Sequence, residues 1–148
     1  MHFIDLLSEE RVRAGLVVRD KAELMECLAG LLADEGGIAP VREALLARER
    51  LGTTALGHGV AIPHGRSSSI AAARAAFVRL AEPIAFGAGD GRGVDLVAAL
   101  IVPAQFTDQH LKILAELAEI FSDPATTAAL RGAADAVALR QLLDHDHA

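Results

Sequence analysis

The apolar stretch that decides the expected fold is Val94-Asp95-Leu96-Val97-Ala98-Ala99-Leu100-Ile101-Val102, which ends at Pro103. Nine residues that are apolar nearly throughout fit a strand at the centre of a sheet that is covered on both faces. A buried helical segment has a similar composition, so periodicity alone leaves that alternative open. We take this stretch as the expected central strand.

Shorter strand-like pieces precede this stretch, and helical patterns stand at both ends of the chain. Alternating side chains predict a strand over residues 75–80, and shorter strands are expected over residues 15–18, 53–56 and 59–62. Helices are expected after Asp20, around Pro40, after Thr107, and over residues 124–131 and 135–143. Connections of hairpin length and longer helical crossovers are both present. This order predicts an α/β fold, a single-domain sandwich spanning residues 1–148 with a mixed β-sheet flanked by helices.

Two of the expected helices carry residues that bear on function. The helix around Pro40 presents Val41, Leu45 and Arg48 on one face, and Gly52 is placed to close it, so Arg48 lies in its last turn. Thr107 is the candidate cap of a later helix. The apolar residues expected along that helix are Leu111, Leu114, Ala118 and Phe121.

The composition excludes several classes of function. The chain has 148 residues, 14 of them basic and 20 acidic, with no run rich in Lys and Arg, which argues against a nucleic-acid partner. No apolar run approaches the ~20 residues of a membrane-spanning helix, so the protein is not expected to be embedded in a membrane. Residues 1–5 lack the organisation of an export signal, and Cys27 is the only cysteine, so a cytoplasmic location is expected.

His64 is the candidate nucleophile. It follows residues 59–62 and Pro63 and precedes Gly65, so its imidazole is expected to project from the end of a strand into a loop. A neutral imidazole has a free nitrogen lone pair and attacks phosphorus without first losing a proton, provided that its other N–H is held. On residues 63–65 alone, a surface histidine in a turn is the better interpretation. The residues elsewhere in the chain favour a chemical role.

His110 and Arg48 are the candidate partners of His64. His110 lies in the first turn of the helix expected after Thr107, where free N–H groups and the helix dipole favour an anion. Arg48 offers a planar fork of donors that suits phosphate oxygens. Taken separately, a solvated histidine and a solvated arginine remain the better interpretations, because nothing local brings either residue to His64.

A metal site is the main rival chemistry. His58, His64 and His110 offer imidazole ligands, but their spacings match no strong zinc pattern. His145 and His147 in the tail are expected to be solvated. No metal site is predicted.

A nucleotide site is the second rival. The stretch Gly87–Gly93 is rich in glycine, but a dinucleotide-binding loop runs from a strand into a helix, and the next element here is the strand that begins at Val94. No Gly-Lys-Ser/Thr sequence follows it. We therefore expect a connecting loop, and no cofactor is predicted.

The chain resembles a known family, the IIA domains of the fructose and mannitol class (EIIA type 2) of the bacterial phosphotransferase system, and most closely their nitrogen-regulatory branch, IIA-Ntr. The matching residues occur in the family's order and span most of the chain, and the motif that ends at His64 is the most specific. The motifs are Arg48-Glu49-Arg50-Leu51-Gly52-Thr53-Thr54, Gly57, Gly59-Val60-Ala61-Ile62-Pro63-His64-Gly65, Pro83-Ile84-Ala85-Phe86, Val94-Asp95-Leu96 through Val102-Pro103-Ala104, and His110-Leu111.

The resemblance implies a mannitol-type EIIA fold and a phosphotransferase component with a phosphohistidine intermediate. It implies that His64 accepts phosphate from a small phosphocarrier protein, HPr or its nitrogen-branch counterpart NPr. His110 matches the family's second active-site histidine, and Arg48 matches its active-site arginine. Thr54 falls in the turn that the family places near the phosphate.

Two functional classes remain within this family. The first is a regulatory protein of nitrogen, potassium or carbon metabolism that binds target proteins according to its phosphorylation state. The second is a free-standing fructose- or mannitol-type EIIA that passes phosphate to a IIB domain for sugar uptake. The absence of an attached IIB-like or membrane segment favours regulation. The sequence departs from the family pattern at Ala55 and His58, and neither departure removes a group with an assigned role.

Overall fold

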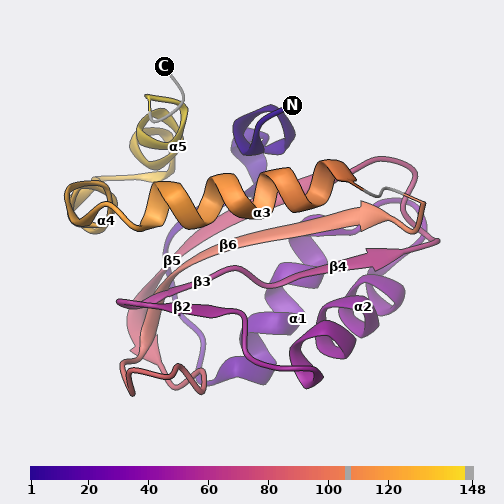
Figure 1. Cartoon of the computed structure of the whole chain (residues 1–148), viewed down its shortest axis with the longest axis horizontal. Coiled ribbons are helices and arrows are strands. Elements are labelled where there is room, and N and C mark those ends of the chain that lie inside the picture. Colours follow the sequence, from indigo (N-terminus) through magenta and orange to yellow (C-terminus); the bar gives the residue numbers. More distant parts are fainter. Residues whose placement is uncertain (106–107, 146–148) are drawn as a thin grey trace.

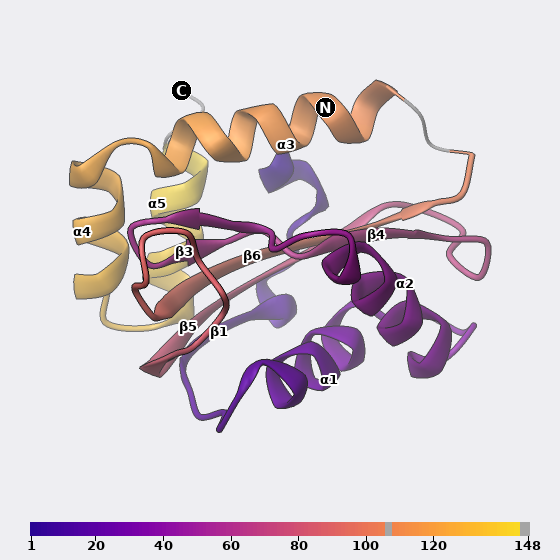
Figure 2. The same ribbon diagram turned by 60° about the horizontal axis from the view of Figure 1, so that its bottom comes forward.

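A computed structural model describes residues 1–105 and 108–145 of the chain. The expected cap Thr107 and the tail residue His147 lie outside these residues, and so does the side chain of His145. A β-sheet lies between two layers of helices, as Figures 1 and 2 show from two directions. The α/β sandwich with a mixed sheet is therefore confirmed.

The sheet is built around β6 (Val94–Pro103). Over the described residues the strand order is β1-β5-β6-β3-β2, and β4 also pairs with β6. β5 runs antiparallel to β6, whereas β3 and β4 run parallel to it. β1 is parallel to β5, and β2 is antiparallel to β3. The other strands are β1 (Val12–Leu16), β2 (Ala55–Gly57), β3 (Val60–Ala61), β4 (His64–Ser67) and β5 (Arg74–Ile84).

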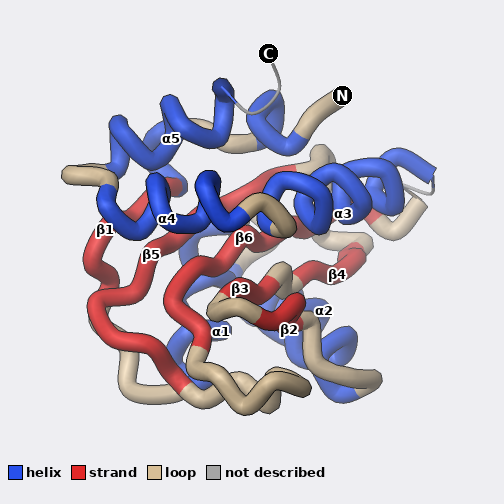
Figure 3. The backbone as a smooth tube through the Cα atoms, turned by 60° about the vertical axis from the view of Figure 1, so that its left-hand side comes forward, coloured by secondary structure: helices blue, strands red, loops and turns tan. Residues whose placement is uncertain are grey.

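Helices cover both faces of this sheet (Figure 3). The helices α1 (Lys21–Leu32) and α2 (Ile38–Arg50) pack on one face. The other face is covered by a 3-10 turn, η1 (Phe3–Leu6), and by α3 (Asp108–Phe121), α4 (Pro124–Gly132) and α5 (Ala136–His145). A second 3-10 turn, η2 (Glu9–Arg11), leads into β1. None of the helices within the described ranges has the length and hydrophobicity that a membrane-spanning helix requires.

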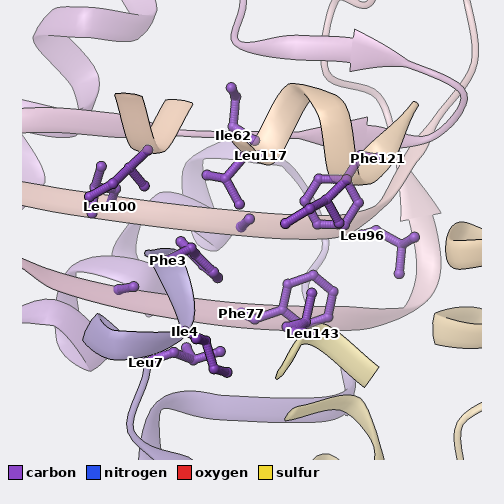
Figure 4. Close-up of a cluster of buried hydrophobic side chains, with 14 of the residues drawn as sticks. Phe3, Ile4, Leu7, Ile62, Phe77, Leu96, Leu100, Leu117, Phe121 and Leu143 are labelled. Carbon is purple, nitrogen blue, oxygen red and sulfur yellow. The ribbon is translucent and has the colours of Figure 1, made fainter. Parts of the chain in front are cut away.

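The side chains of β6 alternate between the two hydrophobic clusters. Leu96, Ala98, Leu100 and Val102 pack toward α3, whereas Val97, Ala99 and Ile101 pack toward α1 and α2. Figure 4 shows Leu96 and Leu100 among side chains from η1, α3 and α5. The expectation of a central strand covered on both faces is confirmed, because every side chain from Leu96 to Val102 is buried.

Two strands differ from the sequence expectation. The first begins at Val12 rather than at residue 15, because Val12 is buried and pairs with Phe77 of β5. The second, β4, was not predicted. His64 is the first residue of β4 and does not project into a loop, because its segment pairs with β6 from Leu100 to Pro103. Pairing with a central strand overrides the weak β-propensity of residues 64–67.

The helix α3 is rotated relative to the face that the sequence suggested. Leu111 and Ala118 are exposed and Leu114 is half-buried, so only Phe121 of the expected apolar residues is buried. Two interleaved apolar stripes run along this helix, and the one that packs on the sheet contains Ile113, Leu117, Ile120 and Phe121. His110 shares this buried stripe.

Candidate functional site

A cavity of about 660 Å³ opens where α2, β4 and α3 meet. Three residues singled out from the sequence line it, namely His64, His110 and Arg48. Arg66 is the fourth basic side chain of the lining. The remaining lining is mostly apolar, and it includes Leu51 and Leu111, which are exposed at 84% and 58%. The structure therefore gathers two imidazoles and two guanidinium groups around one hollow with an apolar rim.

The imidazole of His64 is held by the backbone two residues before it. Its Nδ1 lies 2.8 Å from the carbonyl oxygen of Ile62. Because a carbonyl only accepts hydrogen bonds, this contact places the proton of the neutral ring on Nδ1. The lone pair of the neutral ring is then on Nε2, which is the nitrogen available for nucleophilic attack.

The surroundings of His64 lower its pKa below the usual histidine value. Burial of the ring is the largest cause, since it disfavours the charged form. The Ile62 carbonyl opposes this effect, the charges of Arg48 and His110 add to it, and Glu49 opposes it. The net direction keeps the imidazole uncharged at neutral pH, as a nucleophile requires.

Arg48 reaches the cavity because α2 packs directly on β4. A Cβ atom at Gly65 would lie only 2.8 Å from the backbone of Ala44 in α2, so this close approach requires glycine. Arg48 lies in the last turn of α2, as expected, and its Nη1 donates to the carbonyl of Gly52 at 2.8 Å. This bond directs the arginine along the end of its own helix.

Arg66 is a residue of the site that the sequence analysis missed. Its Nη2 lies 3.2 Å from Nε2 and 3.3 Å from Nδ1 of His110. Alternate residues of a strand point to the same face, so His64 and Arg66 lie on one face of β4. The two-residue spacing between His64 and Arg66 indicates a shared face, but only once residues 64–67 are known to form a strand.

Thr54 is buried beside the site and does not line the cavity. Its hydroxyl donates to Oε1 of Glu49 at 2.6 Å, and its backbone N–H donates to Oε2 of Glu49 at 3.0 Å. The expected contact between Thr54 and a phosphate stays a prediction, since the hydroxyl is engaged by a carboxylate here.

His58 is remote from the other two histidines of the metal-site alternative. It occupies the turn between β2 and β3 with φ +56°, and its N–H donates to Asp90 at 2.8 Å. Val60, which follows the His58 turn, pairs with Leu96 of β6, and His64 pairs with Leu100 of the same strand. About four residues of strand, roughly 13 Å, therefore separate Val60 from His64. Within residues 1–105 and 108–145, no group of three or more His, Cys, Asp or Glu side chains is arranged to hold a metal ion.

The glycine-rich stretch after β5 connects two antiparallel strands, as expected, and does not lead into a helix.

Almost the whole chain matches the model of one protein family. The model of one family, described as "Phosphoenolpyruvate-dependent sugar phosphotransferase system, EIIA 2", matches residues 5–146. The chain belongs to this family.

Relatives of this EIIA type-2 protein include nitrogen regulatory proteins. One from Bradyrhizobium diazoefficiens is 39% identical over 145 residues, which is 97% of this chain and 95% of that protein. The crystal structure of the nitrogen regulatory protein IIA-Ntr from Neisseria meningitidis is similar with a TM-score of 0.88 and 39% identity, covering 95% of this chain and 97% of that one. The resemblance to the nitrogen-regulatory branch is confirmed.

The mannitol-type fold is confirmed as well. The crystal structure of IIA mannitol from Escherichia coli is similar to this EIIA type-2 chain with a TM-score of 0.77 and 23% identity. That likeness covers 92% of this chain and 97% of the mannitol protein. At this identity the likeness concerns the fold alone.

Proposed function

We propose that this EIIA protein accepts a phosphoryl group on Nε2 of His64 from the phosphohistidine of a small phosphocarrier protein of the HPr or NPr kind. The observation that carries the proposal is the 2.8 Å contact between His64 Nδ1 and the Ile62 carbonyl, which leaves Nε2 with the lone pair. The lowered pKa of His64 supports it, because the ring is then uncharged at neutral pH. In this proposal residues 1–148 act as one domain in the cytoplasm.

The transfer step is a displacement at phosphorus. The lone pair of His64 Nε2 forms the new N–P bond while the N–P bond of the carrier breaks, and its electron pair returns to the carrier's imidazole. Because Nδ1 keeps its proton, the His64 ring becomes positively charged as the bond forms. The Ile62 carbonyl is already placed to accept from Nδ1–H and so stabilises that charge.

The basic side chains around the cavity supply the electrostatics of this step. The transferred group spreads negative charge over three oxygens, and positioned cations stabilise it without a cofactor. Arg48 and Arg66 bring two permanent positive charges to the cavity, and His110 faces it from the first turn of α3. We assign phosphate stabilisation to Arg48, Arg66 and His110. Thr54 does not line the cavity, and its hydroxyl donates to Glu49.

The proposed output is regulation of other proteins. A phosphoryl group on His64 carries about two negative charges on its oxygens at pH 7, and it lies in a hollow whose rim presents Leu51 and Leu111. A target protein that packs on this rim then distinguishes the two forms by charge and bulk. The likeness to nitrogen regulatory proteins supports targets in nitrogen metabolism. Targets in potassium or carbon metabolism belong to the same proposal.

Sugar uptake is the second candidate function. The matching family is named for a sugar phosphotransferase system. In this second candidate the chain is a free-standing IIA protein that passes its phosphate to a IIB domain. The two candidates differ in the fate of the phosphate. Rapid discharge to a fructose- or mannitol-type IIB domain would favour sugar uptake over regulation.

The decisive experiment incubates the purified chain with phosphoenolpyruvate, Enzyme I and the cognate phosphocarrier. We expect one acid-labile phosphate on the wild-type chain and none on His64→Ala. His110→Ala should still bind the carrier but should label or discharge slowly. Labelling of His64→Ala to the wild-type level, or a phosphate located on another side chain by mass spectrometry, would overturn the proposal.

A further inference from the structure

A chain of polar contacts runs from a partly buried ion pair to the imidazole of His64. It begins at Glu49 in the last turn of α2, whose side chain is only 6% exposed. One carboxylate oxygen accepts from the Thr54 hydroxyl at 2.6 Å, and the other accepts from Lys21 Nζ at 2.8 Å and from the Thr54 N–H at 3.0 Å. Both oxygens of this carboxylate are therefore engaged.

Lys21 is fixed by groups other than Glu49. Its Nζ donates to the carbonyl of Phe86 at 3.1 Å and lies 4.1 Å from the centre of the Phe86 ring, which favours a cation. Lys21 is the first residue of α1, so the ion pair joins α1, α2 and the segment after β5. Glu49 is thus held by Lys21, which lies outside the site, as well as by Thr54 beside the site.

The contacts continue from Thr54 to the nucleophile. The carbonyl of Thr54 accepts from the N–H of Ile62 at 3.0 Å, which extends the ladder between β2 and β3 by one pair. The carbonyl of Ile62 then accepts from Nδ1 of His64 at 2.8 Å. The backbone that orients the imidazole is therefore tied to the backbone that Glu49 holds.

We propose that Glu49, acting through Thr54, is a positioning residue that keeps the Ile62 carbonyl on Nδ1 of His64 and so keeps Nε2 free to attack. The inference rests on the proposed function of His64. It gives Thr54 a role that needs no contact with phosphate. Neither Glu49 nor Thr54 lines the cavity, so both act through the backbone of residues 54–62.

A second ion pair between the same two helices provides a matched control. Arg42 Nη1 of α2 lies 3.0 Å from both carboxylate oxygens of Glu26 in α1. The Glu26 side chain is 54% exposed, and no described contact links this pair to Thr54 or Ile62. Glu26→Gln therefore removes a bridge between α1 and α2 without touching the path to His64.

The test measures the tautomer of His64 and the rate of phosphorylation in the same variants. Nitrogen-15 NMR of the free protein reports which ring nitrogen carries the proton, and single-turnover labelling by the phosphorylated carrier reports the transfer rate. For Thr54→Val and Glu49→Gln we expect a mixture of tautomers and a rate about 10-fold to 100-fold lower, with carrier affinity unchanged. Thr54→Ser and Glu26→Gln should behave like the wild type.

The expected pattern is distinguishable from simple unfolding and from failure of the proposed function. Thr54→Val and Thr54→Ser differ in the hydroxyl, so the comparison stands even where Glu49→Gln does not fold. A folded Thr54→Val that keeps the proton on Nδ1 and the wild-type rate would overturn the inference. Labelling that survives His64→Ala would instead overturn the assignment of the nucleophile, whatever the tautomer of His64.

Discussion

Nη2 of Arg66 lies within 3.3 Å of both ring nitrogens of His110, and this contact joins β4 to the first turn of α3. A guanidinium nitrogen donates and never accepts, so only the unprotonated nitrogen of a neutral His110 ring can accept a hydrogen bond from it. The contact holds the second histidine at the cavity that His64 also lines. Arg66 therefore organises the site in addition to contributing charge.

Replacement of this arginine should slow phosphoryl transfer without preventing it. In Arg66→Met we expect a single-turnover rate about tenfold lower, which corresponds to losing roughly one charge-assisted hydrogen bond at a partly exposed position. Arg66→Lys keeps the charge but not the planar fork, so its rate should lie between the rates of the wild type and of Arg66→Met. Quench-flow labelling with the phosphorylated carrier measures this. Equal rates in all three proteins would contradict the role.

The titration of His64 should have its midpoint below the ordinary histidine value of about 6.5. Burial disfavours the imidazolium, and the charge of Arg48 also lowers the pKa of His64. An NMR titration of the His64 ring gives the midpoint directly. In Arg48→Met the midpoint should move upward, because one of the causes is removed. A wild-type midpoint at or above 6.5 would contradict the described environment.

The same shift makes the stability of the fold depend on pH. Because the pKa of His64 is lower in the folded state, the unfolded chain binds the proton more readily. The contribution of His64 to the free energy of unfolding is fully present above about pH 6.5, and it is lost as the pH falls toward the pKa of His64 in the folded state. Urea unfolding between pH 5 and pH 8 should show a steeper loss on acidification for the wild type than for His64→Ala.

Two glycine substitutions should change the stability of the fold in opposite directions, one at Gly65, where α2 packs closely on β4, and one at Gly30. In Gly65→Ala the new methyl group meets the Ala44 backbone at 2.8 Å, and we expect a loss of about 1–3 kcal/mol in the free energy of unfolding. Gly30 lies in α1, and outside its own helix no atom lies within 4 Å of the place that an added methyl group would take. Gly30→Ala should therefore stabilise the fold by about 1 kcal/mol. Urea denaturation measures both, and a neutral Gly65→Ala would show that α2 can move away.

Arg131 of α4 holds the turn before β3, at the end of β3 that lies away from His64. This contact should contribute to stability only. Arg131 makes a forked contact with Asp95 at 2.9 and 3.0 Å and also donates to the carbonyl of His58 at 2.7 Å. For Arg131→Met we expect a loss of about 1–2 kcal/mol and a wild-type rate of phosphorylation. The exposed Arg19–Glu23 pair offers the control, since Arg19→Met should leave the stability nearly unchanged. Slow labelling of Arg131→Met would contradict the expectation that the Arg131 contacts contribute to stability only.

The parts of the fold that the sequence predicted are those with strong local signals. The stretch 94–102 is apolar at almost every position, and the structure buries it on both sides. Asp20 caps α1 by accepting from the N–H of Glu23 at 2.8 Å, as its type and position indicated. Pro40 lies in the first turn of α2, where its missing N–H costs nothing.

The parts that were missed depend on contacts between distant segments. Residues 64–67 lack an apolar alternation, and they form a strand because β6 offers them a partner. The face of α3 was misassigned because both Leu111 and Ile113 begin an apolar stripe, and only packing on the sheet selects the second. The pairing of Arg66 with His110 follows from both of these features, so local sequence patterns could not reveal it.

The position of β6 also has consequences for how the chain folds during synthesis. Val12 of β1 pairs with Phe77, and His64 of β4 pairs with Leu100, so the first half of the chain has no complete sheet until β5 and β6 have been made. Closing such long loops has an entropic cost, and sheets of this kind form more slowly than helical bundles. A nascent chain that stops before β6 already contains His64, but it has neither the strand that aligns His64 nor the helix that carries His110. In the proposed function, His64 therefore becomes able to accept a phosphoryl group only after β6 and α3 have been made.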